Sequence, residues 1–203
     1  MKKTIAIDIN DVLRDNLNQF INVYTKFIDH DFKMKFDDFN NYDFYDYLNF
    51  NNHDEFNSFK YINYAFELYG RAEPVEKMLP YKFNNWVKDT LEDFEEEDIP
   101  NILFVSPFEI GLTIQATLSF LSKISSRVRE YYFPIDSSTI WNKCDVLITA
   151  NPNLINNVPD DKKVIKIKMP YNKEVKCEFE FDNMSDLIND ENNTIIKLLE
   201  INE

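Results

Sequence analysis

The chain has 203 residues, of which 44% are hydrophobic, so it can bury the core of one α/β domain with an inserted cap, or of two small domains. Its formal net charge of −14 disfavours binding to nucleic-acid phosphates, and its two glycines are too few for a glycine-rich phosphate-binding loop. Because no apolar run approaches the length of a transmembrane helix, we expect no membrane span.

The first predicted element is a short apolar strand, Thr4–Ile7, which leads directly into a polar segment. Asp8 follows the strand, and Asn10 and Asp11 come next. An amphipathic helix is predicted over Leu13–Phe27, where apolar residues recur three and four positions apart. A buried parallel strand that ends in acidic residues indicates a ligand site at its carboxyl end.

The segment from Asp29 to Phe59 is dense in Asp, Asn, Phe and Tyr and contains no glycine or proline. Its aromatic content distinguishes it from a disordered tract, and we predict short helices here and over Ser58–Tyr69. The aromatic side chains are expected to pack together or, alternatively, to form an interaction surface. His30 and His53 have no regular ligand spacing and are interpreted as surface residues rather than metal ligands.

Two proline-containing segments, Glu73–Val75 and Leu79–Tyr81, are expected to form turns where the chain leaves this region. A helix is predicted over Phe83–Phe94, and the acidic run Glu92–Asp98 is interpreted as a solvated helix end and loop.

Strands and helices then alternate, which indicates an α/β protein with a parallel sheet. The predicted elements are a strand at Asn101–Val105, a helix at Gly111–Ile124, a strand at Arg129–Phe133, a loop at Pro134–Asn142, strands at Asp145–Ile148 and Lys163–Met169, a short strand and helix within Phe179–Ile188, and a tail at Asn192–Ile201.

Cellular context follows from the cysteines and the first residues. Cys144 and Cys177 are far apart and outside any metal-ligand spacing, so we expect two free thiols in a reducing compartment. The first strand is too short for the core of a signal peptide, so we expect a cytoplasmic protein, or a virion protein if the gene belongs to a phage.

The polar strand ends resemble, in the same order, the motifs of the haloacid dehalogenase-like (HAD) phosphatase superfamily, especially its 5'(3')-deoxyribonucleotidase type. The matching segments are Asp8-Ile9-Asn10-Asp11-Val12-Leu13-Arg14-Asp15, Val105-Ser106-Pro107, the frame Asp145, Leu147, Ile148 and Pro152, and Met169-Pro170-Tyr171-Asn172. The resemblance spans about residues 4–190. It implies a Rossmann-like, three-layer parallel sheet built from residues 1–14 and 75–203, with a small helical cap inserted at residues 15–74.

The resemblance also implies roles for single residues. Asp8 would be the nucleophile that takes the phosphoryl group, and Ser106 would hydrogen-bond that group. The family requires an acid at the position of Asn10, whose amide cannot exchange a proton at neutral pH. It also requires a lysine near the site, for which Lys143 is the nearer candidate and Lys123 the other.

A Mg²⁺ ion would be held by Asp8 and by two acids that follow the strand Asp145–Ile148. In this sequence those two positions carry Thr149 and Ala150, so Asp8 alone remains as a charged ligand. Because Mg²⁺ is normally bound through carboxylates, we expect no cofactor, and Mg²⁺ only if the protein is an enzyme.

We therefore predict a catalytically degenerate, nucleotidase-like protein that is kept for a non-enzymatic structural or assembly role. Its partners would be other protein subunits, in a homo-oligomer or a larger assembly, and a phage virion component is one concrete form of that role. The segment Asp29–Tyr69 would supply much of the contact. The alternatives are a phosphatase that acts on (deoxy)nucleoside monophosphates through Asp8, and a module that binds nucleotide or phosphate without cleaving it.

Overall fold

The computed structural model describes residues 2–92 and 99–200, and its centre is a six-stranded sheet in which all neighbouring strands are parallel. The strand order is β3-β2-β1-β4-β5-β6. The strands are β1 (Thr4–Asp8), β2 (Asn101–Val105), β3 (Glu130–Tyr132), β4 (Val146–Thr149), β5 (Lys163–Ile167) and β6 (Phe179–Phe181). The predicted fold class, an α/β Rossmann-like parallel sheet, is confirmed.

Helices cover both faces of this sheet. The α-helices are α1 (Asn16–Phe27), α2 (His53–Ser58), α3 (Leu79–Glu92), α4 (Leu112–Ile124), α5 (Pro152–Asn156), α6 (Met184–Ile188) and α7 (Thr194–Glu200). The shorter 3₁₀- and π-helical segments are η1 (Phe36–Asp38), η2 (Phe44–Tyr47), η3 (Phe59–Asn63), η4 (Phe66–Gly70), η5 (Ser137–Asn142) and η6 (Pro170–Asn172). The apolar residues of α3, α4, α6 and α7 pack with Ile5 and Ile7 of β1, whereas those of η5 and α5 pack with Ala6 on the opposite face.

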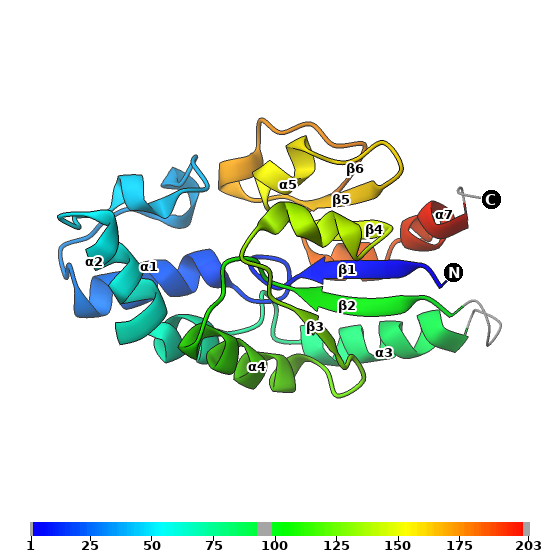
Figure 1. Ribbon diagram of the computed structural model, residues 1–203, viewed down its shortest axis with the longest axis horizontal. Helices are drawn as coiled ribbons and strands as arrows, with labels where there is room; N and C mark the ends of the chain where they lie inside the picture. Colours follow the sequence, from blue (N-terminus) through cyan, green and yellow to red (C-terminus); the bar gives the residue numbers. More distant parts are fainter. Residues whose placement is uncertain (1, 93–98, 201–203) are drawn as a thin grey trace.

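Residues 15–74, which lie between β1 and α3, are here called the helical insertion. Its two ends are joined, because the N–H of Asp15 donates to the carbonyl of Glu73 and the N–H of Val75 donates to the carbonyl of Leu13, each over 3.0 Å. This backbone pairing keeps the start of the insertion out of a helix, so α1 begins later than predicted. Figure 1 shows the insertion at the edge of the sheet toward which β1 and β2 point.

The return from the insertion differs from the prediction. Helix α3 begins at Leu79, not at Phe83, and contains Pro80 in its first turn. Proline is tolerated there because the first N–H groups of a helix have no intrahelical partner. Pro80 therefore lies inside the helix and does not precede it. The predicted helix end at Phe94 and most of the acidic run Glu92–Asp98 lie outside the described residues.

Two further predictions are corrected. The expected loop Pro134–Asn142 contains the 3₁₀-helix η5, whose start is stabilised by the carboxylate of Asp136, which accepts the N–H of Ser138 over 2.9 Å. Strand β5 ends at Ile167, before Met169, because Met169 is already the residue that caps the turn η6.

Aromatic rings form the core of the insertion. The Phe20 ring lies at the centre, with ring centroids of Phe44, Phe59 and Phe56 at 5.2, 5.5 and 6.0 Å. All four side chains are buried. Contacts between aromatic rings add about 0.5–1.5 kcal/mol per pair to the burial of apolar area. Of the two expectations for the aromatic segment, these residues follow the first and pack together.

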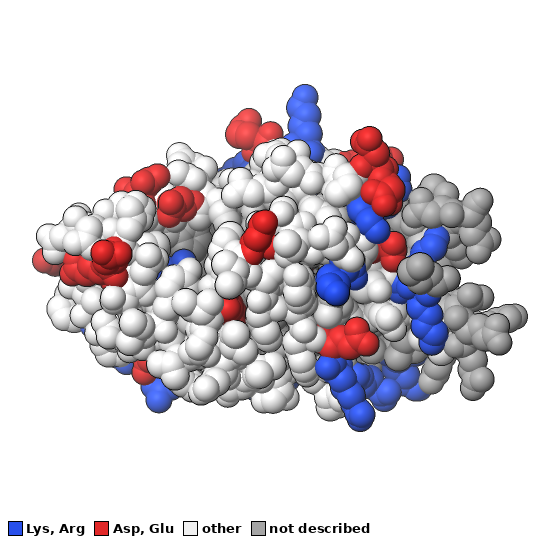
Figure 2. Space-filling model, viewed as in Figure 1, with Lys and Arg blue, Asp and Glu red and all other residues white. Residues whose placement is uncertain are grey.

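Acidic residues outnumber basic residues in the insertion. Figure 2 shows acidic side chains gathered over the insertion and few charged side chains over the middle of the same face. The insertion carries eleven Asp and Glu but five Lys and Arg between residues 15 and 74.

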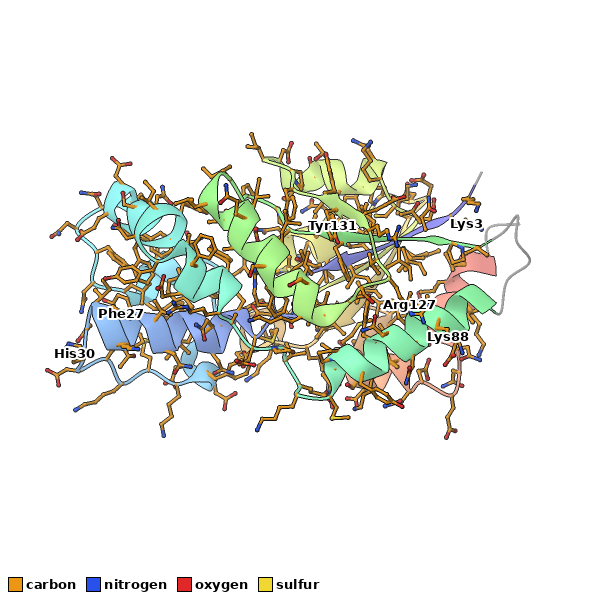
Figure 3. The ribbon with its side chains drawn as sticks, turned by 90° about the horizontal axis from the view of Figure 1, so that it is seen from below. Lys3, Phe27, His30, Lys88, Arg127 and Tyr131 are labelled. Carbon is orange, nitrogen blue, oxygen red and sulfur yellow. The ribbon has the colours of Figure 1, made fainter. Side chains whose placement is uncertain are left out.

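At the opposite end of the molecule, the Lys3 ammonium donates to the carbonyl of Leu199 in α7 (Figure 3). Within residues 2–92 and 99–200, no helix combines the length and apolar content that a membrane span requires.

Candidate functional site

Asp8 lies where the connections of the sheet diverge. It is the last residue of β1, which lies between β2 and β4. The chain continues from β1 to β2 on one side and from β4 to β5 on the other, so Asp8 is at the switch point of the topology. In open α/β sheets, ligands bind in the crevice beside such a point. The site is covered, because only 2% of Asp8 is exposed.

Hydrogen bonds occupy both carboxylate oxygens of Asp8. Its Oδ2 accepts the Thr149 hydroxyl over 2.7 Å, and its Oδ1 accepts the backbone N–H of Asn10 over 3.3 Å. The Thr149 oxygen in turn accepts the N–H of Asn151 over 3.0 Å. Burial raises the pKa of Asp8 to about 7, against the lowering effect of the Thr149 hydrogen bond.

Asp11 supports the start of α1. Its backbone is left-handed, with a φ of 58°, which turns the chain between β1 and α1. Its Oδ1 accepts the N–H of Leu17 and its Oδ2 accepts the Tyr171 hydroxyl, each over 2.8 Å. Burial raises the pKa of Asp11 to about 6. Both of its oxygens are therefore engaged by the fold.

Replacing Tyr171 by Phe is expected to lower the free energy of unfolding by about 1.5–3 kcal/mol at pH 8, because an ionised, buried Asp11 loses a donor. The measurement is urea unfolding. Tyr131→Phe is the matched control, since the Tyr131 hydroxyl donates to the carbonyl of Val128 from a side chain that is 41% exposed. Equal losses in the two variants would contradict the role assigned to Tyr171.

The amide of Asn10 is fixed on both sides. Its Nδ2 donates to the Ser106 hydroxyl oxygen over 3.1 Å. Its Oδ1 accepts from Arg14, from Nε over 3.1 Å and from Nη2. Asn10 thus occupies the position at which the resemblance requires an acid, and its side chain links Ser106 to a buried guanidinium.

Arg14 and Glu109 form a fully buried ion pair beside Asn10. Arg14 is 0% exposed, and its Nη2 lies 2.8 Å from Glu109 Oε1. Its Nη1 donates to Thr117 Oγ1 over 2.6 Å, and its guanidinium lies 4.7 Å from the centroid of the Tyr69 ring. The Ser106 hydroxyl donates to the same Glu109 oxygen over 2.7 Å. Glu109 Oε2 is buried and has no hydrogen-bond partner among the described residues.

The structure does not bring the candidate lysines to Asp8. Lys143 is exposed and precedes β4, whose opposite end carries Thr149, and its ammonium lies 5.9 Å from the centroid of the Tyr132 ring. Lys123, in the last turn of α4, donates to the carbonyl of Gly70 over 3.0 Å. The predicted cluster of Asp8, Asn10 and Ser106 does converge.

The donor set does not fit Mg²⁺. The carboxylates of Asp8 and Asp11 lie at the end of β1 and just after it, and all four of their oxygens accept hydrogen bonds from protein groups. Thr149 and Ala150, at the end of β4, supply no carboxylate. Among the described residues, no group of three or more His, Cys, Asp and Glu could hold a metal ion. We therefore assign no step to a metal.

The histidines lie away from this site. His30 lies at the outer end of the insertion, just after α1, and its Nδ1 is 3.1 Å from the carbonyl of Thr25 (Figure 3). The His53 ring stacks on Tyr45, with centroids 3.9 Å apart.

A cavity of about 120 Å³ lies between the insertion and the carboxyl edge of the sheet. Asn10, Asp11 and Glu109 line it from one side, and Tyr42 and Tyr61 line it from the insertion. Tyr42 also packs edge-on against Tyr171, with ring centroids 5.2 Å apart. The insertion thus covers the switch point and leaves a partly open cavity next to it.

Sequence reasoning missed Arg14, Glu109, Thr117 and the role of Tyr171. One usable signal was the position of Arg14, which directly follows the apolar pair Val12-Leu13 and lies four residues after Asn10. A charged residue in such a position requires a buried partner. Nothing in the sequence identifies Glu109 as that partner.

No family model matches the sequence, and no curated protein matches it. Among solved structures, the chain resembles that of a protein from Burkholderia xenovorans LB400 assigned to the haloacid dehalogenase-like hydrolases. The superposition has a TM-score of 0.56 at 7% identity and covers 96% of this chain and 98% of that one. At this identity the likeness concerns the fold alone: the chain has an α/β fold similar to that of this hydrolase.

Proposed function

We propose that this protein does not hydrolyse phosphate esters and that its HAD-like fold serves a non-enzymatic structural or assembly role. The observation that carries the proposal is the closed network around Asn10. The Ser106 hydroxyl donates to Glu109, and the Asn10 amide is held between Ser106 and Arg14. A hydroxyl that binds a phosphoryl oxygen and an acid that protonates a leaving alcohol are the groups a phosphatase needs at these two positions.

Charge also opposes hydrolysis. A phosphate next to Asp8 would face the carboxylates of Asp8 and Asp11, and the guanidinium of Arg14 is already engaged by Glu109, Asn10 and Thr117. Two unit charges of like sign 4 Å apart repel by about 4 kcal/mol at an effective dielectric constant of 20. Without a cation that fits the site, an anionic nucleophile and an anionic substrate do not approach.

The surface near the site supports binding to other protein subunits. Four apolar side chains are exposed on the loops that follow β2 and β3 and at the start of α4: Phe108 (48%), Ile110 (50%), Leu112 (42%) and Ile135 (77%). The two loops are adjacent, because the N–H of Phe108 donates to the carbonyl of Pro134 over 2.8 Å. Grouped apolar side chains of this kind are typical of protein-binding surfaces.

Hydrolysis is the direct test. With Mg²⁺ present, the wild-type protein is expected to release no more phosphate from p-nitrophenyl phosphate or deoxynucleoside monophosphates than Asp8→Asn does. Asparagine keeps the shape of the side chain and removes the carboxylate that the phosphatase alternative uses to form an acyl phosphate, so the variant measures contaminating activity. A Mg²⁺-dependent turnover that disappears in Asp8→Asn would establish the phosphatase alternative and overturn the proposal.

A further inference from the structure

Strand β3 forms one edge of the sheet, and its outer side is open. Within the described residues it pairs with β2 alone. The Tyr132 carbonyl faces β2, because it accepts the N–H of Ser106 over 3.2 Å. Successive residues of a strand direct their backbone groups to opposite sides, so the N–H and carbonyl of Tyr131 point away from the sheet. Figure 1 shows no helix drawn over β3.

The chain that leads to this edge is poor in charge. Charged residues make up 29% of the whole chain, but residues 99–126 contain two, Glu109 and Lys123. Both are engaged within the chain, Glu109 by Arg14 and Lys123 by the carbonyl of Gly70. In agreement with this, Figure 2 shows few charged side chains over the middle of the face on which Figure 1 shows β3. Depletion of charge is a mark of the core of protein interfaces.

Exposed apolar side chains lie along the strand and at its carboxyl end. Tyr131 is 41% exposed within β3. Ile135 is 77% exposed, more than any other large apolar side chain among the described residues. Phe108, which is 48% exposed, is adjacent, because its N–H bonds to the carbonyl of Pro134. Covering these side chains with a partner would remove their apolar area from water.

Charged side chains flank the edge in a definite order. Arg127 and Arg129 precede β3, Asp136 follows it, and all three are exposed. Within the described residues neither arginine forms an ion pair. Asp136 uses one carboxylate oxygen, which accepts the N–H and the hydroxyl of Ser138. The edge is therefore basic where the strand begins and acidic where it ends.

The other edge strand, β6, differs in this respect. Lys166 in β5 pairs with Glu180 at 3.0 Å, and Lys168 pairs with Asp182 at 2.9 Å. The charges along β6 are thus balanced inside one chain, whereas those beside β3 are not. This difference favours β3 as the edge that meets a partner.

A two-fold axis through the middle of β3 accommodates all of these features. It sets two β3 edges antiparallel, so that the N–H of Tyr131 in each copy can donate to the Tyr131 carbonyl of the other. The start of one strand then lies beside the end of the other. Arg127 and Arg129 of one copy face Asp136 of the other, and their aliphatic stems can cover Ile135. Such a contact uses the same surface twice and closes at two copies.

We infer that the partner of this edge is a second copy of the chain, joined β3 to β3 in a two-fold dimer. The inference rests on the structural role proposed above and names a partner for it. It places the contact at the sheet edge, whereas the sequence led us to expect it in Asp29–Tyr69. The two proposals fail separately. Hydrolysis by a dimeric protein would overturn the proposed function alone, and a monomer without hydrolysis would overturn this inference alone.

Sedimentation equilibrium of the full chain, 24.3 kDa per copy, is the first test. A dimer is expected, with a dissociation constant below about 100 μM. Ile135→Asp brings a carboxylate next to the two-fold contact and is expected to raise that constant at least about tenfold. Ile62→Asp is the matched control, because Ile62 is 63% exposed in the insertion, and it is expected to leave the constant unchanged.

Charge reversal tests the order of charges along the edge. One variant carries Arg127→Glu and Arg129→Glu, and the other carries Asp136→Lys. Each alone opposes like charges across the axis, so each is expected to dimerise at least about tenfold more weakly than the wild type. An equal mixture restores opposite charges at both ends of the contact and is expected to form a heterodimer. Backbone amide exchange at Tyr131 is expected to slow at wild-type concentrations where the dimer forms.

Four results would overturn the inference. The first is a wild-type protein that remains monomeric up to about 200 μM. The second is a dimer that Ile135→Asp and Ile62→Asp weaken equally or not at all. The third is a mixture of the folded charge-reversed variants that associates no better than either variant alone. The fourth is amide exchange at Tyr131 that does not change with dimerisation, which would exclude the pairing of the two strands.

Discussion

Arg14→Met is expected to lower the free energy of unfolding by about 3–5 kcal/mol, because it leaves the buried Glu109 carboxylate without its cation. The same substitution removes the donors that hold the Asn10 amide and the Thr117 hydroxyl. Natural domains are stable by only about 5–15 kcal/mol, so this change removes a large part of the total. Urea unfolding at neutral pH measures it.

Arg71→Met is the matched control. Arg71 forms an ion pair with Glu67 at 3.6 Å, but its side chain is 76% exposed. Exposed pairs contribute about 0–1 kcal/mol, so the same chemical change is expected to have a small effect there. Equal losses in the two variants would mean that the buried network around Arg14 does not stabilise the fold in the way described.

A double variant separates the interaction between Arg14 and Glu109 from the effects of losing each side chain alone. Replacing both Arg14 and Glu109 with apolar residues removes the unpaired charge that each single substitution creates. Such replacements of buried ion pairs are often neutral. Arg14→Met with Glu109→Leu is therefore expected to be less destabilising than the sum of the two single variants, and strict additivity would contradict direct coupling between the two side chains.

Asp8→Asn is expected to stabilise the protein, and to do so more at pH 8 than at pH 5. Burial raises the pKa of Asp8 to about 7 from 3.8. Between these two values the unfolded chain loses the proton that the folded chain keeps, so the stability of the wild type falls as the pH rises. Its contribution is fully present below about pH 3.8 and is lost as the pH passes through about 7.

The size of the effect follows from the shift. Each pKa unit corresponds to about 1.4 kcal/mol, so the advantage of the asparagine grows to about 4 kcal/mol as an upper value above pH 7. The asparagine oxygen can still accept the N–H of Asn10, and its Nδ2 can donate to the Thr149 oxygen, which reverses the direction of that hydrogen bond. Asp161→Asn is the control, because that side chain is 77% exposed. Thermal unfolding from pH 5 to pH 8 should show a widening difference for Asp8→Asn alone, and a constant difference would refute the burial of an ionisable Asp8.

The sheet was predictable because its signal is local. Apolar runs bounded by polar residues mark β1, β2 and β4, and each contains fully buried positions. The start of α1 was not predictable, because the backbone of Leu13 pairs with Val75, more than sixty residues away. The start of α3 was predicted wrongly because of Pro80. A proline ends a helix when it lies in the interior but is tolerated in the first turn, and the sequence alone does not show which applies.

The candidate site was predictable to the extent that its residues follow strands. Asp8 and Ser106 end or follow neighbouring parallel strands, so the sheet brings them together. The network around Asn10 was not predictable, because Arg14 and Glu109 lie 95 residues apart and the resemblance assigns a role to neither. These two side chains determine the chemistry of the site. A contact between loops that are distant in sequence leaves no periodic pattern from which it could be predicted.

The hydrogen bonds between Leu13 and Val75 and between Asp15 and Glu73 have an evolutionary consequence. The chain leaves the α/β core and returns to it at adjacent points. Evolution can therefore substitute, lengthen or exchange residues 15–74 without changing the register of any strand. The insertion that covers Asp8 can therefore diverge quickly in sequence while the sheet that carries Asp8 stays constant. A chain of this kind is free to acquire a new ligand from its insertion alone.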